Sequence, residues 1–223
     1  NESTGNVLGT NIGGCGTPEL VAFTEQSVTN NVGGTPGGGC TYQQKYFRWY
    51  AREGNITSGV ATAAQDANLS AQVPNGMARL RLAYKNNGSG ICQAESLRLF
   101  YSDNGAAYTE LTDTCGEICF GDAPDVNTEQ VTELLTADGT FIPGNVIEST
   151  GARPTLTLEV GNKAENEYVI RVNSTAAGQY CFRLYRDDSI ALTTYTQTAC
   201  FTIDNMTIKG TGQNQASGAG QMR

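Results

Sequence analysis

Ala78-Arg-Leu-Arg-Leu-Ala-Tyr84 alternates arginine with bulky apolar residues, and this alternation decides the fold. A period of two places Leu80 and Leu82 on one face of a strand and Arg79 and Arg81 on the other. Similar segments occur at residues 46–50, 96–101, 167–172 and 180–185. The pattern is typical of an antiparallel sheet with one buried and one solvated face. We therefore expect the arginines on the solvated face, paired with carboxylates on neighbouring strands.

The composition indicates an all-β protein. Among 223 residues, 27 are glycine and only 16% are charged, and turn dipeptides such as Asn75-Gly76 and Asn104-Gly105 separate the short strand-like segments. We expect three hairpins, which join residues 97–101 to 108–111, 155–160 to 167–172, and 180–185 to 191–195. The fold predicted is a two-sheet antiparallel β-sandwich, Ig-like or jelly-roll-like, with extended N- and C-terminal segments.

The chain divides by composition into three parts. Residues 1–44 are poor in apolar residues and are predicted to be an N-terminal extension, a docking arm or donor strand. Residues 45–204 form the predicted sandwich domain, and residues 205–223 form a polar C-terminal tail. No apolar run approaches the roughly 20 residues that span a bilayer. Because the chain also begins at Asn1 rather than Met, we expect a mature, secreted protein without a membrane span.

The cysteine content and the net charge limit which partners, metals and cofactors the chain is expected to bind. The net charge of −8 argues against a nucleic-acid partner, and the chain contains no histidine. We expect no metal and no cofactor. Without a Cys-x2-Cys pair, the seven cysteines favour disulfides in an extracellular, oxidising compartment. They are Cys15, Cys40, Cys92, Cys115, Cys119, Cys181 and Cys200.

Three disulfides leave one thiol over, which is either buried or paired with a neighbouring subunit. We expect Cys15 to pair with Cys40. Cys115 pairs either with Cys119 or with Cys92, and the sequence does not decide between them. Cys181 and Cys200 flank the last predicted hairpin, but their register stays open.

Several segments together carry a resemblance to a known kind of domain. They are Phe47-Arg-Trp-Tyr50, Asn55-Ile-Thr57, Ala63-Ala-Gln-Asp-Ala-Asn68, Arg79-Leu-Arg-Leu82, Leu97-Arg-Leu-Phe-Tyr-Ser102, Tyr108-Thr-Glu-Leu111, Tyr180-Cys-Phe-Arg-Leu-Tyr185 and Ala191-Leu-Thr-Thr-Tyr195. In this order they resemble an Ig-like β-sandwich domain of secreted bacterial cell-surface proteins, over residues 45–203. The resemblance implies a structural or adhesive role without enzymatic activity. The chain departs from that pattern in its many cysteines and in its single copy.

Catalytic residues do not stand out. The absence of histidine excludes Ser–His and Cys–His nucleophiles, and no spacing of acidic residues selects a carboxylate pair. We therefore expect that the chain is not an enzyme.

The flanking segments suggest a structural role. We expect a subunit of a pilus-like extracellular filament or surface assembly, which polymerises with other copies of itself by exchanging terminal strands. The candidate strand residues are Asn6, Val7, Leu8, Ile12, Thr207 and Ile208. The alternative is a secreted adhesin or carbohydrate-binding module that binds surface glycans. The candidate platform residues are Trp49, Tyr50, Tyr84 and Tyr101. Trp49 and Tyr50 point to opposite faces of a strand, and core packing is favoured for Trp49, which leaves an exposed row of tyrosines as the candidate glycan site. Asn-x-Ser/Thr sequons mark candidate glycosylation sites at Asn1, Asn55, Asn68, Asn87, Asn173 and Asn205.

Overall fold

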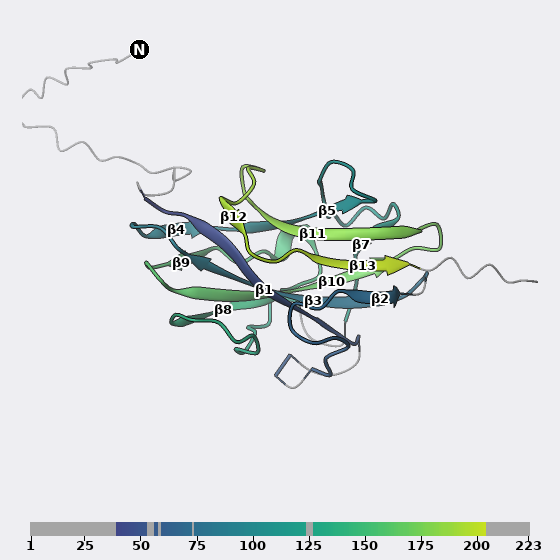
Figure 1. Ribbon diagram of the computed structural model, residues 1–223, viewed down its shortest axis with the longest axis horizontal. Helices are drawn as coiled ribbons and strands as arrows, with labels where there is room; N and C mark the ends of the chain where they lie inside the picture. The colour runs from purple at the N-terminus through teal and green to yellow at the C-terminus, as the bar shows by residue number, and fades with distance from the viewer. Residues whose placement is uncertain (1–38, 53–55, 58, 73, 124–126, 204–223) are drawn as a thin grey trace, which may run out of the picture. The chain divides into compact units, whose positions relative to one another are not determined.

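The computed structural model describes residues 39–52, 56–57, 59–72, 74–123 and 127–203. In this part of the chain, strands dominate and the helical element is one 3-10 turn, Thr150–Ala152. Two main sheets pack face to face (Figure 1). The all-β sandwich predicted from the sequence is confirmed. Among the described residues, no helix has the length and apolar character required to cross a membrane.

The first sheet has the strand order β12-β1-β3-β10-β7, and β8 also pairs with β10. Its strands are Tyr42–Tyr50 (β1), Met77–Asn86 (β3), Ile118–Phe120 (β7), Phe141–Ile147 (β8), Lys163–Val172 (β10) and Thr194–Tyr195 (β12). β3 runs antiparallel to both β1 and β10, whereas β12 joins β1 and β8 joins β10 in parallel. The sheet is therefore mixed rather than purely antiparallel.

The second sheet has the order β2-β13-β11-β5-β6. Its strands are Leu69–Gln72 (β2), Leu97–Asp103 (β5), Thr109–Glu110 (β6), Gly178–Arg186 (β11) and Ala199–Ile203 (β13). Two further strands, Cys92–Glu95 (β4) and Leu156–Leu158 (β9), pair with each other as a separate ribbon.

The hairpin predictions have different outcomes. Asn104 and Gly105 adopt positive φ angles of 47° and 81°, and they turn β5 into β6 as expected. After β11 a bridge between Tyr185 and Ala191 closes the next turn, and the chain then crosses to the first sheet. The predicted hairpin between residues 155–160 and 167–172 does not form, so this prediction is wrong. β9 pairs with β4, because both edges of β10 are already taken by β3 and by β7 and β8.

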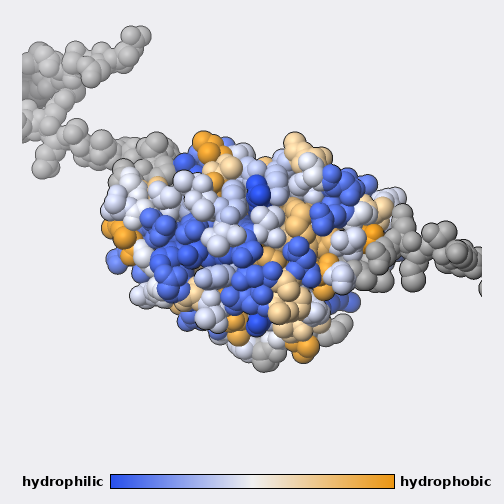
Figure 2. All heavy atoms as spheres, in the orientation of Figure 1, coloured by the Kyte–Doolittle hydropathy of each residue, from blue (hydrophilic) through white to orange (hydrophobic). Residues whose placement is uncertain are grey.

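The core lies between the two main sheets and is rich in aromatic rings. Trp49 packs edge-on against Phe182 and Phe201, with ring centroids 5.8 Å and 5.5 Å apart. Leu80 and Leu82 are fully buried in the same cluster, as the alternation predicts. Figure 2 shows a mostly hydrophilic face with hydrophobic residues in small, separate patches. The apolar side chains are thus used mainly to hold the sheets together.

Gln44 ties the two sheets together. It lies on β1 of the first sheet and is fully buried. Its Oε1 accepts a hydrogen bond from the backbone N–H of Leu184 in the second sheet, at 2.8 Å. Its Nε2 donates to the backbone oxygen of Gln197, also at 2.8 Å. One amide side chain therefore satisfies buried backbone groups across the sandwich.

Candidate functional site

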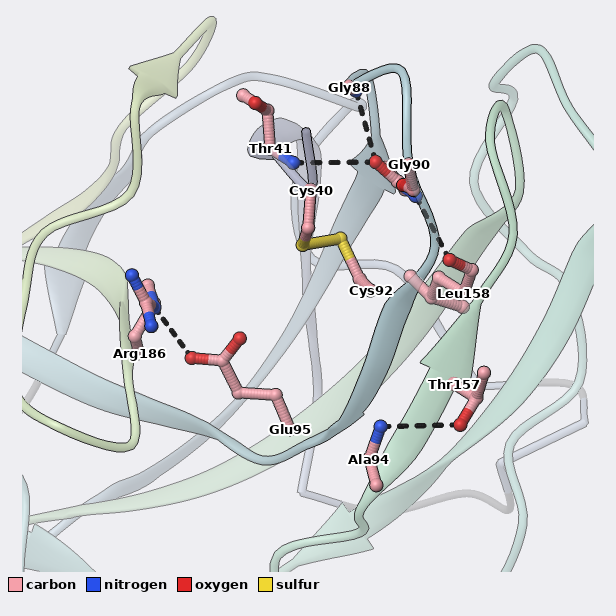
Figure 3. Close-up of a disulfide and its surroundings, with 11 residues drawn as sticks. Cys40, Thr41, Gly88, Gly90, Cys92, Ala94, Glu95, Thr157, Leu158 and Arg186 are labelled. Atoms are coloured by element: carbon pink, nitrogen blue, oxygen red, sulfur yellow. Dashed lines mark hydrogen bonds and ion pairs between the residues drawn. A yellow bond between two sulfur atoms is a disulfide. The ribbon is translucent and has the colours of Figure 1, made fainter. Parts of the chain in front are cut away.

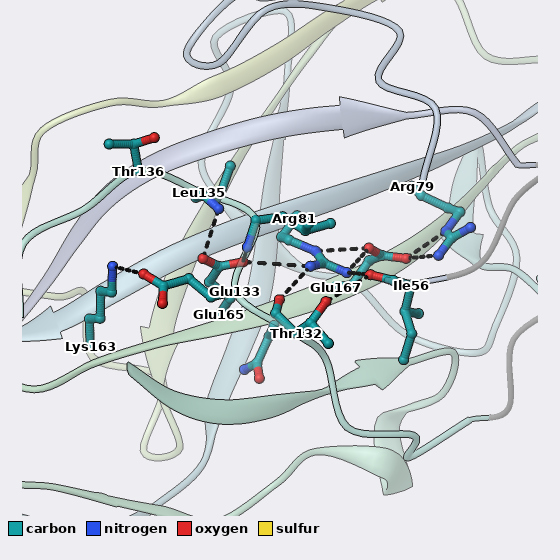
Figure 4. A network of polar contacts seen from close by, with 12 residues as sticks. Ile56, Arg79, Arg81, Thr132, Glu133, Leu135, Thr136, Lys163, Glu165 and Glu167 are labelled. Atoms are coloured by element: carbon teal, nitrogen blue, oxygen red, sulfur yellow. Dashed lines mark hydrogen bonds and ion pairs between the residues drawn. The ribbon is translucent and has the colours of Figure 1, made fainter. Parts of the chain in front are cut away.

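A network of buried charges lies on the outer face of the first sheet (Figure 4). The side chains of Arg79, Arg81 and Glu165 are fully buried, and that of Glu167 is 1% exposed. The prediction that this arginine face is solvated is therefore wrong. The alternation along the strands is correct, but other parts of the chain cover the second face.

Glu167 joins the two arginines. It lies directly opposite Arg81 on the neighbouring strand. Its Oε1 accepts a hydrogen bond from Nε of Arg79 at 2.5 Å, and its Oε2 accepts from Nε and Nη2 of Arg81 at 2.9 Å and 2.7 Å. Arg81 also lies 3.6 Å from Oε2 of Glu165. Both arginine charges are thus compensated inside the protein.

The same side chains bind the two segments that cover them, one around Ile56 and the other at residues 132–137. Arg81 donates hydrogen bonds to the backbone oxygens of Thr132 and Ile56, at 2.8 Å and 3.0 Å. Glu165 accepts hydrogen bonds from the backbone N–H groups of Leu134 and Leu135, at 3.1 Å and 2.9 Å. A small apolar cluster completes the cover, and it consists of Ile56, Val131, Val146 and Val169.

Lys163 extends the network at one end. It pairs with Glu133 and donates a hydrogen bond to the backbone oxygen of Ala137 at 2.5 Å. The pKa of Glu165 is raised by burial, against the opposing effect of the Leu135 and Leu134 N–H groups and of Arg81. Because the carboxylates of Glu165 and Glu167 are closed off from solvent and fully bonded, these groups hold the cover in place.

Replacing Glu165 with glutamine is expected to change how stability depends on pH. The raised pKa means that the folded state binds this proton more tightly than the unfolded state does. The contribution of Glu165 to stability is therefore present below the unfolded pKa and is lost as the pH rises through the folded pKa. The unfolding free energy of E165Q, relative to the unmodified chain, should increase as the pH rises above about 4, the usual pKa of a glutamate. Thermal unfolding of both proteins across this range measures the difference, and a constant difference would contradict the raised pKa.

The aromatic residues proposed as a glycan platform do not form one. Trp49, Tyr50 and Tyr84 are at most 3% exposed, and Tyr101 is only partly exposed and packs against the core. Burial raises the pKa of Tyr50 and of Tyr84, as expected for phenols removed from water. Trp49 packs in the core, as the sequence favours, whereas Tyr50 points to the opposite face and is buried beside Arg81, so an exposed row of tyrosines does not form.

A different set of side chains gathers around Arg183 on the outer face of the second sheet, and we call it the Arg183 ladder. Its members are Phe100, Tyr108, Arg183 and Tyr185, together with Tyr195 from β12 of the first sheet. The guanidinium of Arg183 lies between two rings, 4.9 Å from the centroid of Tyr108 and 4.6 Å from that of Tyr195. Tyr185 stacks on Phe100 at 4.2 Å and lies 6.0 Å from Tyr108. Burial raises the pKa of Tyr195 to about 12.

The sequence analysis did not identify the Arg183 ladder, although the alternation in residues 180–185 places two of its members on one face. In the segment 180–185, Arg183 and Tyr185 share the face opposite to Tyr180 and Phe182. Alternation alone would have placed them outside.

Three disulfides are present in the described part of the chain. Cys40 pairs with Cys92, so the expected Cys15–Cys40 pair is wrong, as is the rival Cys92–Cys115 pair. The reason is local, because the backbone oxygen of Gly39 accepts hydrogen bonds from Ser89 and Gly90 and so brings residue 40 beside the turn that precedes Cys92. Figure 3 shows this disulfide between Cys40, which precedes β1, and Cys92 on β4, with the Arg186–Glu95 ion pair nearby.

Of the other two disulfides, one joins cysteines close in the sequence and one joins cysteines on paired strands. Cys115 pairs with Cys119, which was one of the two alternatives. Cys181 and Cys200 lie directly opposite each other on β11 and β13 and are joined. Cys15 lies outside the described residues.

The remaining candidate residues are placed as follows. All six polymerisation candidates lie outside the described residues: Asn6, Val7, Leu8, Ile12, Thr207 and Ile208. The sequons at Asn1, Asn55 and Asn205 also lie outside them. Asn68 accepts a hydrogen bond from the backbone N–H of Cys200, and Asn173 donates one to Gly116, whereas Asn87 is exposed in a turn. Among the described sequons, Asn68 and Asn87 are exposed and Asn173 is half-buried.

The ribbon of β4 and β9 forms an open edge, at the left of Figure 1. Among the described strands, β4 and β9 pair only with each other. The register places Cys92 opposite Leu158, and Ala94 donates its N–H to Oγ1 of Thr157 at 3.2 Å. Beside the ribbon, Ile91 and Val160 are 42% and 53% exposed.

Comparisons with known proteins give matches among solved structures. No protein-family model and no curated protein sequence matches the chain. A search of solved structures matches a family 123 glycoside hydrolase from Clostridium perfringens, described for glycolipid glycan hydrolysis. The TM-score is 0.34 at 11% identity, and the match covers 73% of this chain and 27% of the other. The chain thus spans about a quarter of the length of that protein.

This match contradicts the expectation that the chain is not an enzyme, and we withdraw that expectation. The absence of histidine excluded only histidine-dependent nucleophiles, whereas glycoside hydrolysis is performed by carboxyl groups. At this TM-score and identity, the match carries no activity over to this chain.

Proposed function

We propose that the chain is a structural subunit of an extracellular filament or surface assembly, in which a strand of one copy adds to a sheet edge of the next. The β4–β9 ribbon is the observation that carries this proposal. An edge strand without a neighbour offers backbone hydrogen-bonding groups to an incoming strand. Leu158 is buried in the core, but Val160, just after β9, is 53% exposed, so the ribbon also offers an apolar side chain to a partner.

The disulfides support the extracellular part of the proposal. Three disulfides in one chain are typical of proteins from oxidising compartments. The resemblance to Ig-like domains of secreted bacterial surface proteins agrees with this location. The terminal segments that contain Asn6–Ile12 and Thr207-Ile208 are the proposed sources of the added strand, and the proposed partner is another copy of the chain.

Lysines at the ribbon are expected to prevent assembly without harming the fold. Ile91→Lys together with Val160→Lys puts two charges beside the open edge, which is how natural edge strands avoid pairing. Because both side chains are already exposed, we expect the free energy of unfolding to change by less than about 0.5 kcal/mol per site. Light scattering and negative-stain electron microscopy should show assemblies for the unmodified chain and monomers for this variant.

A matched control uses an exposed apolar residue outside the ribbon. Val60→Lys adds one charge at a side chain that is 66% exposed, and Val160→Lys alone is its counterpart in the ribbon. This control should assemble like the unmodified chain. A deletion of residues 1–12 should remove the donor strand and therefore abolish assembly. Equal assembly by the ribbon variant and the control would reject the ribbon as the joining edge. Monodisperse monomers of the unmodified chain would reject the assembly itself.

A secreted adhesin or carbohydrate-binding module is the second candidate, and the Arg183 ladder is the observation that favours it. Aromatic residues and arginine on one surface are common in binding sites. The ladder supports a glycan site less well than the ribbon supports assembly, because its ring faces contact one another and Arg183. Binding of a monomeric preparation to a glycan array, lost on Tyr185→Ala, would favour this candidate.

A further inference from the structure

The Cys115–Cys119 disulfide differs from the other two in its exposure. Cys115 is exposed in a turn, whereas Cys119 lies in β7 and is 1% exposed. In the described part of the chain, no cysteine of the other two disulfides is exposed. Because an attacking thiolate must reach a sulfur atom, Cys115 is the most accessible point of attack on any of the three disulfides.

Opening this bond leaves the surrounding structure in place. Asn173 donates hydrogen bonds from its side chain to Gly116 and from its backbone to Glu117, at 2.6 Å and 2.8 Å. The hydroxyl of Tyr180 donates to Oε2 of Glu117 at 2.8 Å. The backbone N–H of Phe120 bonds to Thr112 at 3.0 Å, and Ile118 and Phe120 are buried. These contacts hold β7 whether or not the disulfide is closed.

Opening the Cys115–Cys119 disulfide also costs little stability, because the loop that it closes is short. The two cysteines are four residues apart in the sequence, against 52 and 19 for the other pairs. Since a disulfide stabilises a protein mainly by restricting the unfolded chain, a short loop restricts it least. This bond therefore contributes least to the fold while offering the most exposed cysteine.

We propose that the Cys115–Cys119 disulfide is an exchange site at which a cysteine thiolate of a second copy becomes covalently attached. The incoming thiolate attacks Sγ of Cys115, and a new disulfide forms there. The bond between Cys115 and Cys119 breaks, and its electron pair leaves on Sγ of Cys119, which then takes a proton from water. The number of disulfides is unchanged, so no oxidant is required. The identity of the attacking copy rests on the proposed assembly function.

Cys15 supplies the incoming thiol. Six of the seven cysteines pair with one another in the described part of the chain, and Cys15 is the seventh. Each link uses Cys15 of one copy and Cys115 of the next, and each added copy brings its own Cys15. Exchange of this kind extends a covalent chain in one direction.

The first experiment tests the site without assembly. The Cys15→Ser variant is incubated with reduced glutathione in the absence of oxygen, free thiols are blocked with iodoacetamide, and the products are mapped by mass spectrometry. We expect glutathione on Cys115 and a blocked thiol at Cys119 in more than tenfold excess over adducts at the other four cysteines. An equal distribution over the three disulfides, or preferential attachment elsewhere, would overturn the proposal.

The second experiment identifies the partner. Non-reducing gel electrophoresis of the unmodified chain should show a ladder that is lost both in Cys15→Ser and in the double variant Cys115→Ala with Cys119→Ala. A ladder that persists in the double variant would place the links at another disulfide, and a dimer band alone would show direct pairing between Cys15 residues; either result would overturn the proposal. Light scattering separates this result from the assembly itself. If the unmodified chain assembles without any covalent ladder, the assembly function stands and the exchange proposal fails.

Discussion

Replacing Glu167 with glutamine is expected to lower the free energy of unfolding by about 3–5 kcal/mol. Glu167 bonds to Arg79 and Arg81, and all three side chains are at most 1% exposed. Glutamine has nearly the same shape, so the substitution removes the negative charge that Arg79 and Arg81 share inside the protein, and Arg81 keeps only the more distant carboxylate of Glu165. Urea denaturation followed by circular dichroism measures the loss.

Asp187→Asn provides the control for this result. Asp187 also pairs with an arginine, Arg98, but its side chain is 57% exposed. An exposed ion pair contributes at most about 1 kcal/mol, so this variant should lose far less stability than E167Q. Losses of similar size in the two variants would show that the network around Glu167 is solvated and not buried.

Removal of the Cys40–Cys92 disulfide is expected to cost about 4 kcal/mol, because it closes the longest loop. With alanine at both positions of each pair, the same relation gives about 3 kcal/mol for Cys181–Cys200 and about 2 kcal/mol for Cys115–Cys119. The corresponding sequence separations are 52, 19 and 4 residues. Denaturation of the three double variants under identical conditions gives their order. If the Cys115–Cys119 variant were the least stable of the three, loop length would not be the deciding factor.

The sequence predicted the strands well because strand formation depends on local alternation. Leu80 and Leu82 face the core as expected, and the Asn104-Gly105 turn forms the expected hairpin. Pairing between distant strands was less predictable. Residues 155–160 and 167–172 alternate equally well, but alternation does not state which edge a strand joins, and β9 joins β4.

The candidate sites were harder to predict than the fold. Alternation separated Arg79 and Arg81 from the core side chains, but it could not reveal that residues 132–137 would cover them. That segment has no strand periodicity, and its contribution is made by backbone groups such as the oxygen of Thr132. Disulfide partners depend equally on distant contacts, so only the neighbouring pair Cys115–Cys119 was within reach of the sequence.

The buried charges also have a consequence for how the chain folds. Arg81 lies opposite Glu167 in the pairing of β3 with β10, and every second residue of β3 faces the aromatic core. A slip of one residue between these strands would turn Arg79 and Arg81 toward Trp49 and Phe182, where no carboxylate could compensate them. Such a misaligned intermediate would be too unstable to persist. The buried charges would thus disfavour misaligned pairing of β3 with β10 during folding, before the two sheets pack together.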